Sequence, residues 1–316
     1  MNRVRMQVGL EEISNSIGNR NDEALIDGSG VTVAVLDSGV WSHPDLSGRI
    51  VAFHDFISGK KQPYDNNGHG THICGIICGN GMMSGGKYCG IAPGCRLVVG
   101  KVLDHKGEGM TQYMLEGLEW ILDNKDRYQI KIVNISVGVG NLTDEKKEEA
   151  LKKKIEEVWD SGIIVVCAAG NKGPADGSIS SVGSSRKVIT VGCHDGIYCM
   201  GNPKRCETYS GRGPFTALVR KPDLVAPGTD ICSCNVLYQI PKAGRNVEQY
   251  YYTIKSGTSM ATPVISGAAA LLLQKQPQLS NESVKLRMTY TADDLGIAWN
   301  QQGWGMINIK KLLERY

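Results

Sequence analysis

Residues 31–37 read VTVAVLD, a short and almost uninterrupted apolar run that ends in an aspartate. A run of this length and composition predicts a strand of a parallel sheet that is buried on both faces. Four further stretches are equally short and rich in valine and isoleucine: RLVVGKVLD at 96–104, KIVNISVG at 131–138, GIIVVCAAG at 162–170 and KVITVGC at 187–193. We expect these runs to form one sheet.

Helix candidates lie between and after these runs. Residues 111–126 and 144–161 carry apolar side chains at helical spacing on one face, and residues 263–276 are apolar nearly all round, as in a buried helix. The alternation predicts an α/β fold, a doubly wound and mostly parallel sheet with helices on both faces. We expect a single domain over residues 1–316, with residues 1–30 as an N-terminal arm. In such sheets the site lies beyond the carboxyl ends of the strands.

The composition is that of a soluble globular protein, with 316 residues, 41% apolar and 21% charged. The net charge of +3 is too small to indicate nucleic-acid binding. No stretch reaches about 18 uninterrupted apolar residues, so no membrane span is expected. The first residues lack the apolar core of a signal peptide, which predicts a cytoplasmic protein, unless the chain is a processed form that is secreted. The sequence gives no indication of oligomeric state.

The chain has ten cysteines. A long chain without a leader favours reduced thiols, and no pair has the C-x-x-C spacing typical of a zinc site. The competing interpretation is a secreted enzyme with a bridge such as Cys89–Cys95 or Cys193–Cys199, whose short loops could close without much strain.

Three segments carry residues suited to nucleophilic catalysis. Asp37 closes the first strand in VAVLDSGV, His69 stands between two glycines as a helix begins in NNGHGTH, and Ser259 precedes the buried helix in SGTSMATP. A serine hydroxyl becomes a nucleophile when a histidine takes its proton, and a buried carboxylate fixes the histidine tautomer. The order Asp, His, Ser is one of the orders in which such triads are built.

A fourth segment supplies an oxyanion donor. The motif AAGNKG places Asn171 at the end of a predicted strand, where its amide can donate a hydrogen bond to a developing negative charge. The backbone N–H of Ser259 is the natural second donor, helped by the positive end of the helix that follows.

Together these motifs resemble those of the subtilases, the subtilisin-like serine peptidases. DSG, GHGTH, AAGN and GTSMATP match that family's pattern in order, and the 32 residues from Asp37 to His69 are typical of it. Further matches are HPDL at 43–46, GIAP at 90–93, SGRGP at 210–214 and KPDLVAPG at 221–228. The resemblance implies a serine endopeptidase with Asp37 as the orienting carboxylate, His69 as general base and acid, Ser259 as nucleophile and Asn171 as oxyanion donor.

The resemblance also implies that a protein or peptide substrate binds as an extended strand between two segments of the enzyme. One side would be formed by residues 107–111, including Gly107, Glu108 and Gly109, and the other by Ser136, Val137 and Gly138. The primary specificity pocket would be lined by that second segment, by Ala168, Ala169 and Gly170, and at its base by Gly183. Small residues there leave room for a large side chain, so broad specificity with a preference for large apolar residues is expected.

The chain departs from the secreted subtilases at the loop of residues 79–90. This loop lacks the asparagine-rich sequence that holds calcium in many of them, and it has no carboxylate, which a hard cation favours. Asp45 matches a calcium ligand of the family but has no evident partners, so no cofactor is required and calcium binding is left open. No prodomain is visible before the strand at 31–37. These features resemble the intracellular, AprX-type subtilases.

Other interpretations of the same residues fit the pattern less well. His72 could form a zinc pair with His69, but no H-E-x-x-H motif is present, and a packed helix residue is favoured. A binding protein that keeps the fold without the chemistry would lack a triad member or the oxyanion donor, whereas all four residues are present. An esterase of the α/β-hydrolase type would carry a G-x-S-x-G motif, which the sequence does not contain.

Overall fold

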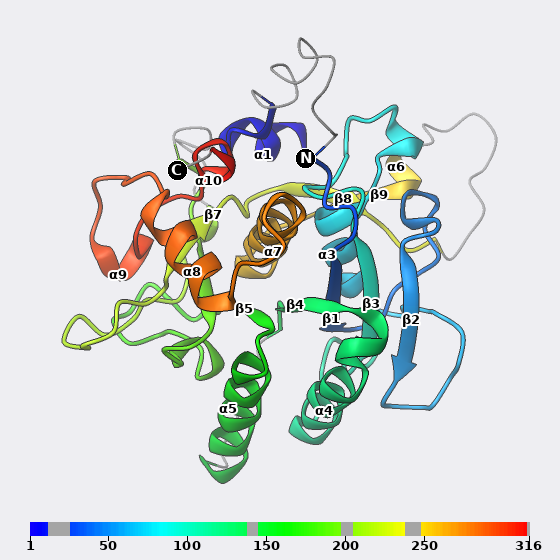
Figure 1. Ribbon diagram of the computed structural model, residues 1–316, viewed down its shortest axis with the longest axis horizontal. Coiled ribbons are helices and arrows are strands. Elements are labelled where there is room, and N and C mark those ends of the chain that lie inside the picture. The colour runs from blue at the N-terminus through cyan, green and yellow to red at the C-terminus, as the bar shows by residue number, and fades with distance from the viewer. Residues whose placement is uncertain (12–25, 138–144, 197–204, 238–247, 315–316) are drawn as a thin grey trace.

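The computed structural model describes residues 1–11, 26–137, 145–196, 205–237 and 248–314. Its centre is a parallel sheet in the order β2-β3-β1-β4-β5-β6-β7 (Figure 1). The strands are β1 (Thr32–Asp37), β2 (Ile50–Asp55), β3 (Arg96–Lys101), β4 (Ile130–Ile135), β5 (Ile164–Ala168), β6 (Ile189–Cys193) and β7 (Leu224–Ala226). Strand β1 pairs in parallel with β3 on one side and with β4 on the other. The predicted doubly wound α/β fold is confirmed.

The five predicted apolar runs coincide with β1, β3, β4, β5 and β6, in each of which all residues or all but one are buried. Strand β2 escapes the pattern because it is only partly buried and its sequence, IVAFHD, is not a continuous apolar run. Strand β7 has three residues, too few to stand out. Both lie at the edges of the sheet, but only β2 is partly exposed, since the three residues of β7 are all buried.

Four long helices flank the sheet: α3 (His69–Cys78), α4 (Thr111–Tyr128), α5 (Glu145–Asp160) and α7 (Thr258–Lys275). Helices α3 and α7 pack against each other on one face, and α4 and α5 cover the other (Figure 1). The predicted helices at 111–126 and 144–161 agree with α4 and α5. The layers place the first turns of α3 and α7 close together.

Helix α7 is buried along almost its whole length, as expected, but it begins at Thr258, five residues before the predicted start. Proline suits the beginning of a helix, so the apolar run that starts at Pro263 resembles a helix start. In the structure Pro263 lies inside α7. Ser259 is therefore the second residue of the helix and does not precede it, which corrects the sequence-based placement.

Smaller elements complete the fold. They are α1 (Asn2–Gln7), α6 (Glu248–Tyr251), α8 (Asn281–Tyr290), α9 (Trp299–Gln302) and α10 (Ile309–Leu313), the antiparallel pair β8 (Ile231–Cys234) and β9 (Tyr252–Lys255), and the 3-10 turns η1 (Pro44–Leu46), η2 (Met82–Ser84), η3 (Val182–Ser184) and η5 (Cys206–Thr208). Among the helices of the described residues, none has the length and apolar character needed to cross a membrane.

The described part of the predicted N-terminal arm is packed onto the body of the molecule. Met1, Val4 and Val8 are buried in the core. The Val8 carbonyl accepts a hydrogen bond from the Ile309 N–H at 2.7 Å, which joins this segment to the start of α10.

Candidate active site

Asp37 and His69 meet where β1 ends and α3 begins. Asp37 is fully buried, and His69 Nδ1 lies 2.8 Å from Asp37 Oδ1 and 3.0 Å from Oδ2. Gly70 makes this approach possible, because a Cβ at this position would strike the Gly39 carbonyl and lie 3.2 Å from the Asp37 Cβ. The glycine that follows His69 thus lets the first turn of α3 press against the loop after β1.

Asp65, which the sequence analysis did not single out, fixes the helix that carries His69. Its carboxylate accepts hydrogen bonds from the N–H groups of Gly68 and Thr71 at 2.8 and 2.9 Å and from the Thr71 hydroxyl at 2.6 Å. Ser38, the residue after Asp37, donates to Asp65 and accepts from the Gly70 N–H, each at 2.9 Å. The N-cap of α3 is Gly68, so the usual side-chain capping pattern gives no sequence signal for Asp65.

Two opposing influences set the pKa of His69. Burial disfavours the imidazolium and acts to lower the pKa. The charge of Asp37 and its hydrogen bond act to raise the pKa, and they outweigh burial together with the repulsion from Lys255. The net result is a pKa above the ordinary 6.5, so Asp37 stabilises the protonated histidine.

Ser259 and His69 line the same surface cavity, of about 250 Å³. Its other lining residues are Asn67, Leu103, Lys106, Gly107, Ser136 and Val137. In the structure, the side chains of Ser259 and His69, both among the described residues, form no direct hydrogen bond to each other. Catalytic hydrogen bonds of this kind commonly form only when substrate is bound. The serine hydroxyl and the imidazole therefore face one space that a substrate can enter.

Asn171 lies three residues past the end of β5, beside the first turn of α7. Its Oδ1 accepts hydrogen bonds from the Thr258 N–H and the Thr258 hydroxyl. Gly257, with a φ of 147°, leaves this corner open: a Cβ there would lie 3.3 Å from Asn171 Nδ2 and 3.8 Å from the Ser259 backbone nitrogen. The two predicted oxyanion donors are thus neighbours.

The predicted substrate-binding residues fall into two groups. Gly107, Ser136 and Val137 line the cavity with His69 and Ser259. Glu108 and Gly109 continue the exposed loop after Gly107 but are not among the residues that line the cavity. Gly138 lies outside the described residues.

The remaining residues of the predicted specificity pocket, 168–170 and Gly183, are not among those that line this cavity. The Ala168 and Ala169 carbonyls accept hydrogen bonds from the Ser180 hydroxyl and N–H, each at 2.8 Å, and the Gly170 carbonyl accepts from the Gly211 N–H at 2.7 Å. Gly183 is buried beneath Ser180, whose Oγ would lie 2.8 Å from a Cβ at this position. Sequence reasoning missed three residues of the cavity wall, namely Asn67, Leu103 and Lys106.

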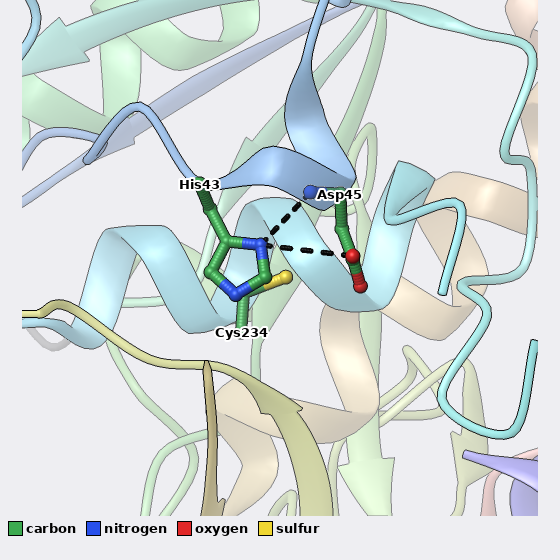
Figure 2. Close-up of side chains that lie close together, drawn as sticks. All are labelled: His43, Asp45 and Cys234. Atoms are coloured by element: carbon green, nitrogen blue, oxygen red, sulfur yellow. Dashed lines mark hydrogen bonds and ion pairs between the residues drawn. The ribbon is translucent and has the colours of Figure 1, made fainter. Parts of the chain in front are cut away.

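His43, Asp45 and Cys234 are buried with their ligand atoms close enough to surround a metal ion (Figure 2). However, the atoms that would bind a metal ion already have hydrogen-bond partners in the protein. His43 Nδ1 accepts from the Asp45 N–H at 3.0 Å, and His43 Nε2 lies 2.8 Å from the Tyr251 carbonyl. Neither ring nitrogen of His43 thus has a free lone pair for a metal ion. Burial also raises the pKa of the Cys234 thiol well above its usual value, which disfavours the thiolate form that a metal binds. This cluster does not fit a metal.

The Asp45 carboxylate, expected to match a calcium ligand, is bound by protein groups on both oxygens. Oδ1 accepts from the Met83 N–H at 3.0 Å, and Oδ2 accepts from the Tyr252 hydroxyl at 2.6 Å. Met83 belongs to the loop at 79–90, so the aspartate organises that loop directly.

The cysteines differ from expectation at one pair. Cys193 at the end of β6 and Cys206 in η5 form a disulfide, with Cα atoms 5.7 Å apart. The expectation of reduced thiols is therefore wrong at these two positions. The alternative pairings are wrong as well, because Cys193 pairs with Cys206 and neither Cys89 nor Cys95 is bridged. Cys199 lies outside the described residues. The bridge joins the end of β6 to η5, 13 residues later in the chain.

His72 is a packed helix residue. It is fully buried, and its Nε2 lies 3.0 and 3.2 Å from the Ile231 and Thr253 carbonyls. Burial lowers its pKa to about 3, so the imidazole is neutral and donates to these carbonyls.

The chain is similar to known serine peptidases over most of its length. Residues 28–305 match the sequence profile of the subtilase family (Peptidase_S8). Serine protease AprX of Bacillus subtilis (strain 168) is 42% identical over 276 residues, which cover 84% of this chain and 62% of that protein. Subtilisin DY of Bacillus licheniformis is 32% identical over 284 residues, 90% of either chain.

Solved structures show the same similarity. A cold adapted subtilisin-like serine proteinase has a TM-score of 0.69 and 29% identity, with 92% of both chains covered. Sphericase has a TM-score of 0.73 and 27% identity, and the alignment covers 94% of this chain and 96% of that one.

Proposed function

The chain belongs to the subtilase family of serine peptidases, and on that premise we propose that it is an endopeptidase whose nucleophile is Ser259. One observation carries the proposal: Ser259 and His69 face a single cavity while the imidazole is bound to Asp37 through Nδ1. This is the geometry that turns a serine hydroxyl into a nucleophile.

The proposed reaction begins when His69 Nε2 takes the proton of the Ser259 hydroxyl as Oγ attacks the carbonyl carbon of the scissile peptide bond. Asp37 holds the Nδ1–H tautomer and stabilises the imidazolium. The tetrahedral oxyanion accepts hydrogen bonds from Asn171 Nδ2 and the Ser259 N–H. His69 then gives its proton to the leaving amine, and an acyl-enzyme ester remains on Ser259. A water molecule, deprotonated by His69, hydrolyses that ester.

We propose that protein or peptide substrates bind as an extended strand along residues 107–109 and 136–138. Gly107, Ser136 and Val137 support this path because they line the cavity with the nucleophile. The preference for large apolar residues rests on the small residues of 168–170 and on Gly183. Lys106 places a positive charge on the cavity wall, so we add a preference for an acidic side chain near the scissile bond.

We further propose that residues 1–316 act as one peptidase domain that needs no cofactor and holds no strong calcium ion at the loop of residues 79–90. Protein donors on both oxygens of Asp45 support the second point. A cytoplasmic location stays a prediction. It rests on the described cysteines that carry no disulfide, most of which are buried where a thiol is a natural apolar side chain.

The proposal is tested by labelling the purified chain with a fluorophosphonate probe, which reacts with an activated serine whatever the substrate. We expect mass spectrometry to find the adduct on Ser259, and casein digestion to stop in the Ser259→Ala variant. An adduct on another serine, or full casein digestion by the alanine variant, would contradict the assignment.

A further inference from the structure

A second and larger cavity, of about 640 Å³, opens on the surface between α8 and α9, which lie together at one side of the molecule (Figure 1). We call it the α8–α9 groove. Its side walls include Arg220, Leu286, Tyr290, Ile297, Trp299 and Trp304. None of its lining residues belongs to the cavity that holds Ser259.

Exposed apolar side chains gather at this groove. Of the ten large apolar side chains that are exposed in the described residues, three line it: Leu286, Tyr290 and Trp304, at 71%, 78% and 50% exposure. Two more, Phe215 and Leu218, precede Arg220 in the chain, and the Phe215 ring lies 5.3 Å from that of Trp299. Apolar side chains concentrated in one place on a monomer mark an interaction site.

Two charged side chains of the groove have partners within it. Asp294 accepts hydrogen bonds from the Gly296 N–H at 2.9 Å and from Gln302 Nε2 at 2.8 Å. The Arg220 guanidinium lies 4.1 Å from the centre of the Trp304 ring. A ligand would therefore meet mainly aromatic and aliphatic surface, which suits the side chains of an extended peptide better than a charged small molecule.

The groove is connected to the catalytic loop through Asp176. The Asp176 carboxylate accepts the Phe215 N–H at 3.0 Å and Asn300 Nδ2, in α9, at 3.2 Å. Asp176 follows Asn171 by five residues, a stretch of chain that can span at most roughly 18 Å. A substrate strand advances about 3.3 Å per residue. A polypeptide that leaves Ser259 and follows residues 171–176 would span that stretch with about six residues before it meets α9.

We propose that the α8–α9 groove is an exosite that binds an apolar segment of the polypeptide whose peptide bond lies at Ser259. This inference rests on the proposed endopeptidase function and adds a second contact with the same substrate. An unfolded protein chain exposes leucine and aromatic side chains that a folded one buries. The groove thus favours long, unfolded and apolar-rich substrates over short peptides.

The test compares quenched fluorescent peptides that share one cleavage sequence. One is short, and others carry a twelve-residue extension, rich in either leucine and phenylalanine or serine and asparagine, on the amino or the carboxyl side. We expect the apolar extension on one side to raise kcat/KM about tenfold, mainly through KM, which corresponds to about 1.4 kcal/mol. The Leu286→Ser/Tyr290→Ser double variant should lose that gain and cleave the short peptide as well as the wild type.

Met82→Ser, which removes an apolar side chain that is 58% exposed in η2, is the control and should keep the gain. Equal rates for apolar and polar extensions, or a double variant that keeps the gain, would overturn the proposal. So would a concentration-dependent dimer in sedimentation that the double variant abolishes, because the groove would then bind a second copy. Fluorescence anisotropy of labelled peptides measures their binding to the Ser259→Ala variant, which does not depend on catalysis. Tighter binding of the apolar extension would therefore support the exosite even if the proposed peptidase function were wrong.

Discussion

Asn171 is held in place by Thr258: its Oδ1 accepts hydrogen bonds from the Thr258 N–H at 3.1 Å and from the Thr258 hydroxyl at 3.0 Å. Both acceptor bonds orient the amide, so Nδ2 is directed to the corner left open by Gly257. Because Thr258 is the first residue of α7 and Ser259 the second, the same turn positions the side-chain donor and the backbone donor.

We predict that Asn171→Ala lowers kcat far more than it raises KM. The amide would act on the oxyanion, which exists only in the transition state, so ground-state binding should change little. In subtilisin, loss of such a donor costs about 10²–10³ in rate, and we expect the same range here. Steady-state kinetics on a peptide substrate give the split, and a loss confined to KM would show that Asn171 only binds substrate.

Thr258 supplies the control for that experiment. Thr258→Ser keeps the hydroxyl and should retain near wild-type kcat, whereas Thr258→Ala keeps only the backbone bond to Asn171. We expect Thr258→Ala to lower kcat several-fold, less than removal of the amide itself, because one of the two orienting bonds remains.

The pH dependence of kcat/KM should have its acidic limb above pH 6.5. The base form of His69 is the neutral imidazole, and Asp37 raises its pKa, so activity falls as the pH drops through that raised value. Asp37→Asn removes the two largest influences that raise the pKa of His69 and leaves only the weaker one of Asp65, while burial still lowers the pKa, so the residual activity should have its acidic limb at lower pH. An unchanged limb in Asp37→Asn would contradict the assigned cause; NMR titration of His69 is the independent measurement.

The fold and the four catalytic candidates could be predicted because their signals are local. The run that ends at Asp37 is apolar along its whole length, and the motifs around His69, Asn171 and Ser259 each occupy a few consecutive residues. Strand β2 could not be predicted in this way, since partial burial at the edge of the sheet leaves no continuous pattern.

Features that depend on residues far apart in the chain could not be predicted from the sequence. Asp65 acts on α3 through a network that includes Ser38, which lies 27 residues earlier. Lys106 reaches the cavity wall because of how its loop folds, and the Cys193–Cys206 bridge needs β6 and η5 to be neighbours. None of these relationships follows from spacing along the chain.

We predict that Lys106 favours substrates with an acidic side chain close to the scissile bond. A peptide series with Glu, Gln or Lys at each position in turn should show a preference for Glu at one position of about two- to fivefold, the range of an exposed ion pair. Lys106→Ala should abolish the preference and Lys106→Glu invert it, and added salt should weaken it. Lys131→Ala is the control, because Lys131 lies at the start of β4, whereas the cavity is lined by residues that follow the end of β4. Identical profiles in wild type and Lys106→Glu would contradict the prediction.

Thiol titration should find eight reactive cysteines in the denatured chain without reductant and ten with it. The chain has ten cysteines, and two of them, Cys193 and Cys206, form the described bridge. In Cys193→Ser, Cys206 loses its bridge partner and becomes a free thiol. All nine remaining cysteines should therefore react, with or without reductant. Ten thiols in the wild type before reduction would show that the bridge does not form in solution.

We predict that a calcium chelator leaves the thermal stability of the Ser259→Ala variant unchanged; this background prevents self-digestion. In place of a cation, the Asp45 carboxylate has the Met83 N–H on one oxygen and the Tyr252 hydroxyl on the other. Burial and the bond to Asp45 raise the pKa of Tyr252, so the hydroxyl keeps its proton and donates throughout the neutral range. A large fall in Tm with chelator would show that a cation holds this region after all.

Tyr252→Phe isolates the contribution of that hydroxyl. Its loss leaves a buried carboxylate oxygen without a donor, which should cost about 1–3 kcal/mol of unfolding free energy. Tyr290→Phe removes the hydroxyl of a tyrosine that is 78% exposed and should change stability by less than about 0.5 kcal/mol. Urea unfolding of the two variants gives the comparison. If Tyr252→Phe were as stable as the control, the hydroxyl would not be what satisfies Asp45, and the argument against calcium at this loop would lose its basis.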